Sequence, residues 1–320
     1  MGGYLRAQKC SPVLRLSFDT EAAVRSAWRR VCPDAPVAKT IEILKETSNG
    51  GVYRLTGTGV IAKRALRETA LFERLIYQDI LAKLPLRALR FHGFLDEESS
   101  GFSWLFLEDA GGIECSLENE TYRKLAASWL ARLHVSAARI PFAADLPRYD
   151  AAGYRADLFS GRARILQNLG NPVFTEADRA VLRSILGYLD RLEEWWTVVD
   201  EFCANLPLTL IHNDLQSKNM HICEDQNGTR LCVFDWEYAG WGLPCKDLVG
   251  LNLAVYSETV REAWPALNGR LLQQAADTGN LFRVLSAISW AAEYLPWSSA
   301  QMRRLHWYNA DLQKILRTLG

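Results

Sequence analysis

The sequence contains no CxxC pair of cysteines, the arrangement that begins most zinc sites and dithiol redox sites. The cysteines are odd in number and scattered along the chain: Cys10, Cys32, Cys115, Cys203, Cys223, Cys232 and Cys245. Such a distribution does not form the disulfide framework of a small secreted domain. We therefore interpret them as reduced, mostly buried thiols and expect a cytoplasmic protein.

An excess of charge of one sign is lacking too. Lys plus Arg and Asp plus Glu each number 37, and no run of five or more like charges occurs. Because a polyanion is held mainly by positive charge, we expect no nucleic-acid partner. No apolar run approaches the roughly 18 residues of a membrane span, and the N-terminal residues lack the apolar core of a secretion signal. We expect no membrane association, and nothing in the sequence indicates the oligomeric state.

The first third of the chain has the pattern of an antiparallel sheet. A short helix is predicted over about 20–31. Three β-type runs follow, separated by the turn SNGG and by glycines, and two further runs flank a Ser-Gly turn. A helix is predicted between these groups, over about 66–82, with leucines and an isoleucine on one face. This part is therefore expected to be a small sheet with one main helix.

After Gly111 and Gly112 the pattern changes to long amphipathic helices. One is predicted over about 121–138, and another opens with the capping box TEAD at 175–178. Strands first and helices second predict an α+β fold with two lobes, residues 1–110 and residues 111–320.

A strand-rich segment interrupts these helices and carries the polar residues of interest. Asn227-Gly228 lies between two apolar-rich runs, MHIC and LCVFD, which is a strong signal for a β-hairpin. A hairpin brings its two ends together, so Asn219 and Asp235 should lie close in space. Asp214 lies five residues before Asn219, in a loop after the predicted strand LTLI. Two carboxylates and an amide are hard oxygen ligands, which favour magnesium over zinc or copper.

The spacing HxDxxxxN, followed by a hairpin and a second Asp, is typical of phosphoryl transfer. In that interpretation Asp214 accepts the proton of the attacking hydroxyl, while Asn219 and Asp235 hold magnesium on the phosphates. The alternative is that these residues only cap turns, where Asp and Asn are common. The order of sheet lobe, loop, hairpin and second Asp favours catalysis.

The sheet lobe should supply a lysine to the phosphates. Lys63 ends the run VIAK on the third predicted strand, where the kinase pattern places that lysine. Its carboxylate partner is expected on the following helix, where Glu68 and Glu73 are both available. We choose Glu73, because a first-turn carboxylate such as Glu68 is expected in any helix. The loop containing Ser48 and Asn49 offers backbone N–H groups to phosphates, although alone it is also an ordinary turn.

Taken together, these motifs resemble the aminoglycoside phosphotransferase and choline kinase superfamily, over about 40–251. The matching segments are SNGGVYRL, AK at Lys63, ERLIY, LFLEDAGG, LARLH, HNDLQSKN and FDWEYAGWGLPCKDL. The resemblance implies a two-lobed, protein-kinase-like fold with nucleotide bound by the first lobe and the acceptor by the second. It implies ATP or GTP and Mg²⁺ as cofactors. It also implies that a segment between the lobes contacts the purine through backbone groups, namely Leu107, Glu108, Asp109 and Ala110.

Some residues depart from the protein-kinase pattern. Trp236-Glu237 replaces Phe-Gly after the metal-binding Asp, Asn213 replaces the HRD arginine, and no APE segment follows. These differences count against a protein substrate and favour a hydroxylated small molecule. A pseudokinase that only binds is disfavoured because the motif residues are retained. By resemblance, His212 and Asp247 support the catalytic loop, and we interpret His134 as a hydrogen-bonded core histidine.

The resemblance leaves two acceptor classes open. GLPCKDL resembles antibiotic phosphotransferases, our first choice, whereas HNDLQ and DWEYAG resemble choline and ethanolamine kinases. Glu237 is expected near the acceptor, where a carboxylate favours an ammonium group, and Trp236 offers cation–π contact. Further acceptor contacts are predicted from residues at helical spacing near the C-terminus, for which core packing is the favoured alternative: Trp290, Glu293, Tyr294 and Trp297.

Overall fold

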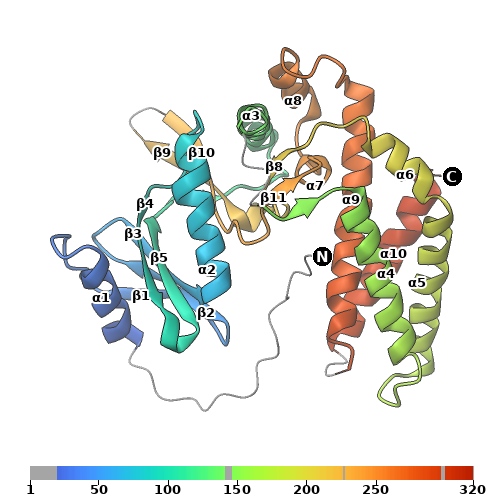
Figure 1. Cartoon of the computed structure of the whole chain (residues 1–320), viewed down its shortest axis with the longest axis horizontal. Helices are drawn as coiled ribbons and strands as arrows, with labels where there is room; N and C mark the ends of the chain where they lie inside the picture. The colour runs from blue at the N-terminus through green and yellow to red at the C-terminus, as the bar shows by residue number, and fades with distance from the viewer. Residues whose placement is uncertain (1–19, 141–145, 226–227, 297–299, 320) are drawn as a thin grey trace. The chain divides into compact units, whose positions relative to one another are not determined.

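The computed structural model describes residues 20–140, 146–225, 228–296 and 300–319 (Figure 1). The chain divides into two compact units. The first runs to Arg74 and includes Arg90–Asp109, and the second comprises Leu75–Leu89 and Ala110 onward. The break after Asp109 lies at the expected end of the first lobe, but residues 75–89 group with the second unit. The roles assigned to the two lobes remain predictions.

The first unit is built on a five-stranded antiparallel sheet in the order β1-β2-β3-β5-β4. Its strands are β1 (Ile41–Thr47), β2 (Gly50–Leu55), β3 (Val60–Leu66), β4 (Phe91–Glu97) and β5 (Phe102–Glu108), with the 3₁₀ turn η3 (Glu98–Ser100) before β5. Helix α1 (Thr20–Val31) precedes the sheet, and α2 (Arg67–Arg74) follows β3. The predicted strands and the short N-terminal helix are confirmed.

The two faces of this sheet carry different contacts. On one face, Trp104 and Phe106 of β5 pack in one apolar cluster with Val24 and Trp28 of α1. The neighbouring position on β5, Leu105, faces the other way and clusters with Ala70 of α2. Because Lys63 pairs directly with Leu105 in the sheet register, the Lys63 side chain lies on the α2 face.

The helix predicted over 66–82 is only partly α-helical. After α2 the chain continues as a π-helix, η1 (Leu75–Ile80), and a 3₁₀ turn, η2 (Leu81–Lys83). Apolar spacing does not distinguish these winding patterns over so few residues. The element ends at Leu84, which is extended because Pro85 follows it.

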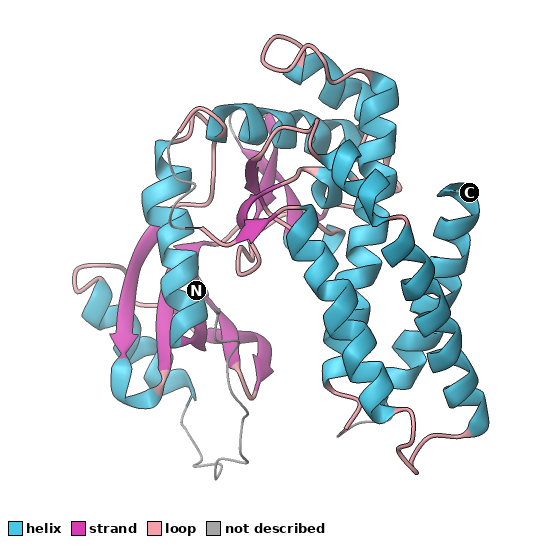
Figure 2. Cartoon of the chain, turned by 45° about the vertical axis from the view of Figure 1, so that its right-hand side comes forward, coloured by secondary structure: helices cyan, strands magenta, loops and turns pink. Residues whose placement is uncertain are grey.

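The second unit is mostly helical (Figure 2). Its long helices are α3 (Glu120–Ala137), α4 (Ala151–Asn168), α5 (Glu176–Glu194), α9 (Gly269–Glu293) and α10 (Ala300–Leu319), and its shorter ones are α6 (Trp196–Cys203), α7 (Cys245–Leu248) and α8 (Leu253–Val260). The capping box at Thr175 and Asp178 is present at the start of α5. None of the helices in the described ranges is long and apolar enough to cross a membrane.

Two small sheets complete the second unit. One has the order β10-β9-β6 and the other β7-β11-β8. Their strands are β6 (Ile113–Glu114), β7 (Arg148–Tyr149), β8 (Thr209–Ile211), β9 (Met220–Asp225), β10 (Gly228–Val233) and β11 (Gly240–Gly242), and the 3₁₀ turn η5 (Ser217–Asn219) leads into β9. β9 and β10 are antiparallel with Met220 opposite Val233, so the predicted hairpin pairing is confirmed. Asn227 lies outside the described residues.

Helix α9 is the centre of the helical part. It packs against α4, α7, α8 and α10. At Gly279 it comes so close to α7 that an added Cβ would lie 2.0 Å from the carbonyl oxygen of Cys245. Only glycine fits this contact, which fixes α7 and the residues that follow Cys245 against α9.

Candidate active site

The catalytic loop predicted from HxDxxxxN leaves the buried strand β8 and ends in η5. Its first two residues are held by Asp247 of α7. The Asp247 carboxylate accepts hydrogen bonds from the backbone N–H of His212 at 2.7 Å and of Asn213 at 2.8 Å. Asn213 adopts a left-handed backbone with φ of 66°, a conformation that Asn tolerates better than most residues. The loop is therefore held in a bent shape by a buried carboxylate.

Asp247 is stabilised as a carboxylate despite its burial. Burial alone raises the pKa of Asp247, but the hydrogen bond and charge of His134, together with His212, outweigh this and lower it. His134 is buried, and its Nδ1 lies 2.9 Å from the hydroxyl of Tyr256. The interpretation of His134 as a hydrogen-bonded core histidine is confirmed.

His212 uses both ring nitrogens on backbone groups. Its Nε2 lies 3.0 Å from the carbonyl oxygen of Phe234, and its Nδ1 accepts from the N–H of Asp214 at 3.4 Å. In this arrangement Nδ1 acts as the acceptor and Nε2 as the donor. His212 thereby ties the start of the catalytic loop to the end of β10.

Asp214 lies at the centre of a polar group. Its Oδ2 lies 3.0 Å from Asn219 Nδ2 and 3.2 Å from Lys218 Nζ, and its Oδ1 accepts a hydrogen bond from Gln216. The Asp214 side chain is 21% exposed, so a ligand has access to it while protein groups fix its orientation.

Asn219 and Asp235 are brought together as the hairpin predicts. The backbone carbonyl of Asn219 accepts from the N–H of Phe234 at 3.1 Å, which places Asp235 directly beyond the open end of the hairpin, opposite its turn. Asn219 donates through Nδ2 to both the backbone carbonyl and the side chain of Asp214, so its amide nitrogen is directed to Asp214. Asp235 has φ of 68° and, like Asn213, is a left-handed residue other than glycine. Strained backbone of this kind concentrates at functional sites.

The prediction that Trp236 contacts the acceptor is wrong. Trp236 is fully buried, and its ring packs 4.6 Å from the ring centre of His212 and 6.3 Å from that of Trp129. Trp236 instead packs in the core against His212 of the catalytic loop. Glu237 is exposed, as an acceptor contact requires.

Tyr238 is a site residue that the sequence reasoning missed. Its ring is half exposed, and partial burial together with the charges of Glu237, Asp214 and Asp235 raises the pKa of Tyr238 to about 12. Its hydroxyl therefore stays protonated at neutral pH and is able to donate a hydrogen bond to a ligand.

Two cations near the loop were also missed. Arg283 of α9 donates to the carbonyl oxygen of Leu215 at 3.2 Å. Lys246 is 8% exposed, and its Nζ lies 5.6 Å from the ring centre of Tyr154, whose hydroxyl donates to Asn213. Burial lowers the pKa of Lys246 to about 8, against the opposing charges of Asp247 and Asp157. The position is unremarkable in the sequence, because its burial depends on how α7 packs.

Two of the predicted nucleotide-binding groups lie in the first unit. Lys63 Nζ is 2.8 Å from Glu73 Oε2, and the Glu73 side chain is 1% exposed. The structure thus pairs Lys63 with Glu73 rather than with Glu68. Ser48 and Asn49 form the exposed turn between β1 and β2, in which Thr47 Oγ1 accepts from the backbone N–H of Asn49 at 3.2 Å.

In the segment expected to contact the purine, several backbone and side-chain groups already bond to other parts of the first unit. The N–H of Glu108 donates to the carbonyl of Arg90, the N–H of Asp109 donates to that of Gly59, and the Asp109 carboxylate is paired with Arg54 at 2.6 Å. The Leu107 side chain is buried. A purine contact through this segment stays a prediction.

The aromatic residues near the end of α9 are not core residues. Trp290 and Tyr294 are 41% and 40% exposed, with ring centres 5.0 Å apart. Glu293 is paired with Arg164 at 3.3 Å. Core packing is therefore the wrong interpretation for these two rings, and Trp297 lies outside the described residues.

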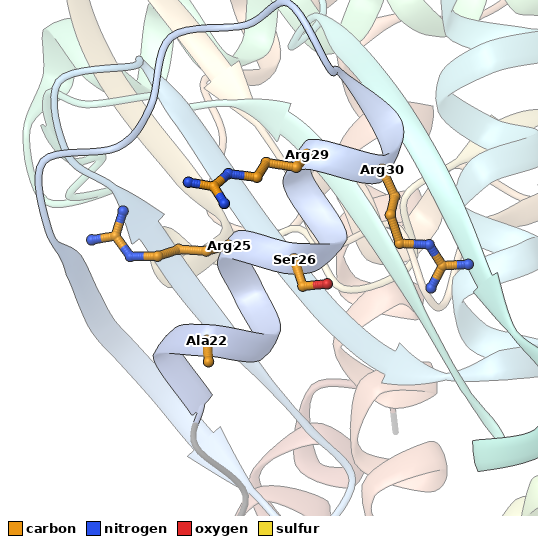
Figure 3. A pocket seen from close by; sticks show the side chains of 5 residues that line it. All are labelled: Ala22, Arg25, Ser26, Arg29 and Arg30. Carbon is orange, nitrogen blue, oxygen red and sulfur yellow. The ribbon is translucent and has the colours of Figure 1, made fainter.

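A hollow on α1 contains none of the predicted site residues (Figure 3). It is lined by one helix only, through Ala22, Arg25, Ser26, Arg29 and Arg30. Arg25 is occupied by Glu21 and by the carbonyl of Ala38. We assign no role to this surface.

Comparison with known proteins identifies the family. The sequence profile described as the phosphotransferase enzyme family, APH, matches residues 40–288. The chain belongs to this phosphotransferase family. No curated protein sequence matches the chain.

Solved structures of similar fold include antibiotic phosphotransferases and a choline kinase. APH(2")-IIia, in a complex with GDP and kanamycin, shares 14% identity with a TM-score of 0.62, covering 91% of this chain and 99% of its own. Choline kinase from Cryptosporidium parvum shares 12% identity with a TM-score of 0.62, covering 93% and 96%. Spectinomycin phosphotransferase APH(9)-Ia, with ADP and spectinomycin, shares 11% identity with a TM-score of 0.57, covering 92% and 94%. The chain has the kinase-like α+β fold of these enzymes, and by family it is a small-molecule kinase.

Proposed function

We propose that the chain transfers the terminal phosphate of ATP, or of GTP, to a hydroxyl group of a small molecule in a magnesium-dependent reaction. The observation that carries this proposal is the convergence of Asp214, Asn219 and Asp235. Asn219 bonds to Asp214 through its amide and to the residue before Asp235 through its carbonyl. This is the donor set and the chain order that phosphoryl transfer uses.

Each residue has one proposed role. Asp214 accepts the proton of the acceptor hydroxyl, which requires that hydroxyl within hydrogen-bond distance of its carboxylate. Asn219 and Asp235 hold the metal. Lys63 contacts the nucleotide phosphates, and the buried Glu73 fixes its position. Leu215 and Asn213 are held by Arg283 and Asp247, so the loop is ordered before substrates bind.

The residues present fit a magnesium ion. An amide oxygen and a carboxylate are hard ligands, and magnesium completes its shell with water and phosphate oxygens rather than with a full set of protein ligands. When bound, the metal neutralises charge on the transferring phosphate.

For the acceptor we propose an antibiotic of the aminoglycoside-phosphotransferase type, with an amino alcohol such as choline or ethanolamine as the second candidate. Solved structures of similar fold include enzymes bound to kanamycin and spectinomycin as well as a choline kinase. Exposed Glu237 favours an ammonium group on the acceptor, and Trp290 and Tyr294 offer aromatic surface on α9. We also propose a cytoplasmic location, a compartment in which cysteine thiols stay reduced.

A panel assay tests this function. Phosphorylated product is measured with ATP or GTP, with and without Mg²⁺, for aminoglycosides, spectinomycin, choline, ethanolamine and uncharged polyols. We expect metal-dependent product with at least one amine-bearing acceptor, and a raised KM for that acceptor in Glu237→Gln. Nucleotide binding without turnover of any acceptor would favour a pseudokinase. Efficient use of polyols with no effect of Glu237→Gln would show that the electrostatic part is wrong.

A further inference from the structure

Two cysteine side chains meet across the β9–β10 hairpin. The Sγ atoms of Cys223 and Cys232 are 2.7 Å apart, and the residues are 4% and 2% exposed. In the strand register Cys223 lies opposite Arg230 and Cys232 opposite His221, so the two cysteines are diagonal neighbours on one face of the hairpin. Both side chains are thiols rather than halves of a disulfide, and the fold already holds their sulfurs in contact.

The two thiols have different surroundings. Cys223 Sγ donates to the carbonyl oxygen of Ala110 at 3.0 Å, whereas Arg230 Nη1 lies 2.9 Å from Cys232 Sγ. A guanidinium beside a sulfur stabilises negative charge on it, and the thiolate is the reactive form of cysteine. Cys232 is therefore placed as the attacking sulfur and Cys223 as the second thiol of a pair.

We propose that Cys223 and Cys232 form a redox modification site that small two-electron oxidants such as hydrogen peroxide convert to a disulfide. The Cys232 thiolate attacks one peroxide oxygen, the O–O bond breaks, and the sulfur becomes a sulfenic acid while hydroxide leaves and is protonated. Cys223 then attacks that sulfur, the S–O bond breaks, and a second water leaves. Two thiols and one peroxide give one disulfide and two waters. A dithiol reductant reverses the reaction.

The disulfide changes a contact of the predicted purine segment. Once bonded to Cys232, the Cys223 sulfur has no proton to donate, so the carbonyl of Ala110 loses this hydrogen bond. Ala110 ends the segment that the family resemblance predicts to contact the purine, so this consequence rests on the proposed function. Loss of one hydrogen bond that orders the segment is expected to weaken nucleotide binding about two- to tenfold.

Other buried cysteines are poor candidates for the same chemistry. Burial raises the pKa of Cys115 to about 11 and that of Cys203 to about 12, so both stay protonated near neutral pH. Cys32 is partly exposed and packs in the first unit, which makes it a suitable reporter of general oxidation.

The full chain is treated with hydrogen peroxide, its free thiols are alkylated, and a peptide map records each cysteine. We expect a Cys223–Cys232 linked peptide that forms before Cys32 is consumed and disappears on treatment with dithiothreitol. The wild-type map alone decides this point. Cys232→Ser is the variant that cannot form the bond, and Cys32→Ser is the matched control that retains it. Free Cys223 and Cys232 after Cys32 has been oxidised would overturn the proposal.

Calorimetry with ATP and Mg²⁺ on reduced and oxidised protein tests the coupling. We expect weaker binding after oxidation in wild type and Cys32→Ser, restored by dithiothreitol, and no change in Cys232→Ser. A mapped disulfide with unchanged affinity would refute the link to Ala110. If the reduced chain itself binds no nucleotide, the proposed function fails. The peptide map remains an independent test of whether Cys223 and Cys232 form a disulfide.

Discussion

The Asp214 carboxylate is accessible to a ligand, and its orientation is fixed by hydrogen bonds from Asn219 and Gln216. Asp214→Ala is expected to reduce turnover at least 10²–10⁴-fold, roughly the effect of removing a general base, while nucleotide affinity changes little. Steady-state kinetics and nucleotide titration measure the two effects separately. The exposed Asp277 of α9 provides the control Asp277→Asn, for which we expect unchanged kinetics. Turnover of Asp214→Ala within a few-fold of wild type would remove Asp214 from this role.

Lys246 gives a pH-dependent prediction. Its pKa is lowered to about 8 from the usual 10.5, so between these values the unfolded chain holds a proton that the folded chain has released. Stability from this group therefore rises with pH across that window, and below about pH 8 the folded state bears the full penalty of a buried charge.

Lys246→Met removes this penalty and is expected to stabilise the chain near neutral pH by up to about 3 kcal/mol. It should also flatten the rise in stability between pH 8 and 10.5. Urea unfolding of both proteins at several pH values measures the difference. Lys124→Met, at a lysine whose side chain is 54% exposed, is the control and should show no such change. Equal pH dependence in Lys246→Met and wild type would contradict this account.

The polar residues of the site were predictable because their spacing in the chain is short and their chemistry is specific. Asp214, Asn219 and Asp235 are joined by a loop and one hairpin, whose register follows from local turn signals. Lys246 and Trp236 were not predictable in this way. Their burial depends on distant helices, and a sequence pattern does not show which side of a loop the protein core covers.

Helix α2 and strand β3 together position one ion pair. Glu73→Gln leaves Lys63 without its buried carboxylate, which lies 2.8 Å away in the wild type. We expect a stability loss of about 1–3 kcal/mol and weaker nucleotide binding, because Lys63 is no longer held toward α2. Glu68→Gln, in the first turn of the same helix, is the matched control. Equal effects of the two substitutions would show that the pairing is not important for binding.

Strands bounded by clear turn residues were predicted well. The change from α-helix to π-helix after α2 was not predicted. The five strands of the first sheet follow from β-type runs separated by turns that contain glycine or serine. The change from α2 to the π-helix η1 occurs within a continuous apolar pattern, so the residues gave no sign of it. Trp290 and Tyr294 have the spacing of a buried stripe, yet the end of α9 leaves both rings exposed.

Ligand binding should be visible in the stability of the chain as a whole. ATP with Mg²⁺ at about 100 times its Kd is expected to stabilise the folded chain by about 2.7 kcal/mol, seen as a higher Tm. Removing the metal with EDTA should reduce this shift. In Asp235→Ala the metal-dependent part should disappear, while any metal-independent binding remains. An identical shift with and without EDTA in wild type would argue against a metal held by Asp235.

The contact at Gly279 has an evolutionary consequence. Any other residue there would push its first side-chain atom against the backbone of Cys245, and α7 would have to move together with Asp247. Such a relative would keep every residue of the phosphoryl-transfer motif and would look intact when only that motif is aligned. Its loss of activity would trace to a position with no chemistry of its own. We therefore expect active relatives of this chain to keep glycine at the position of Gly279.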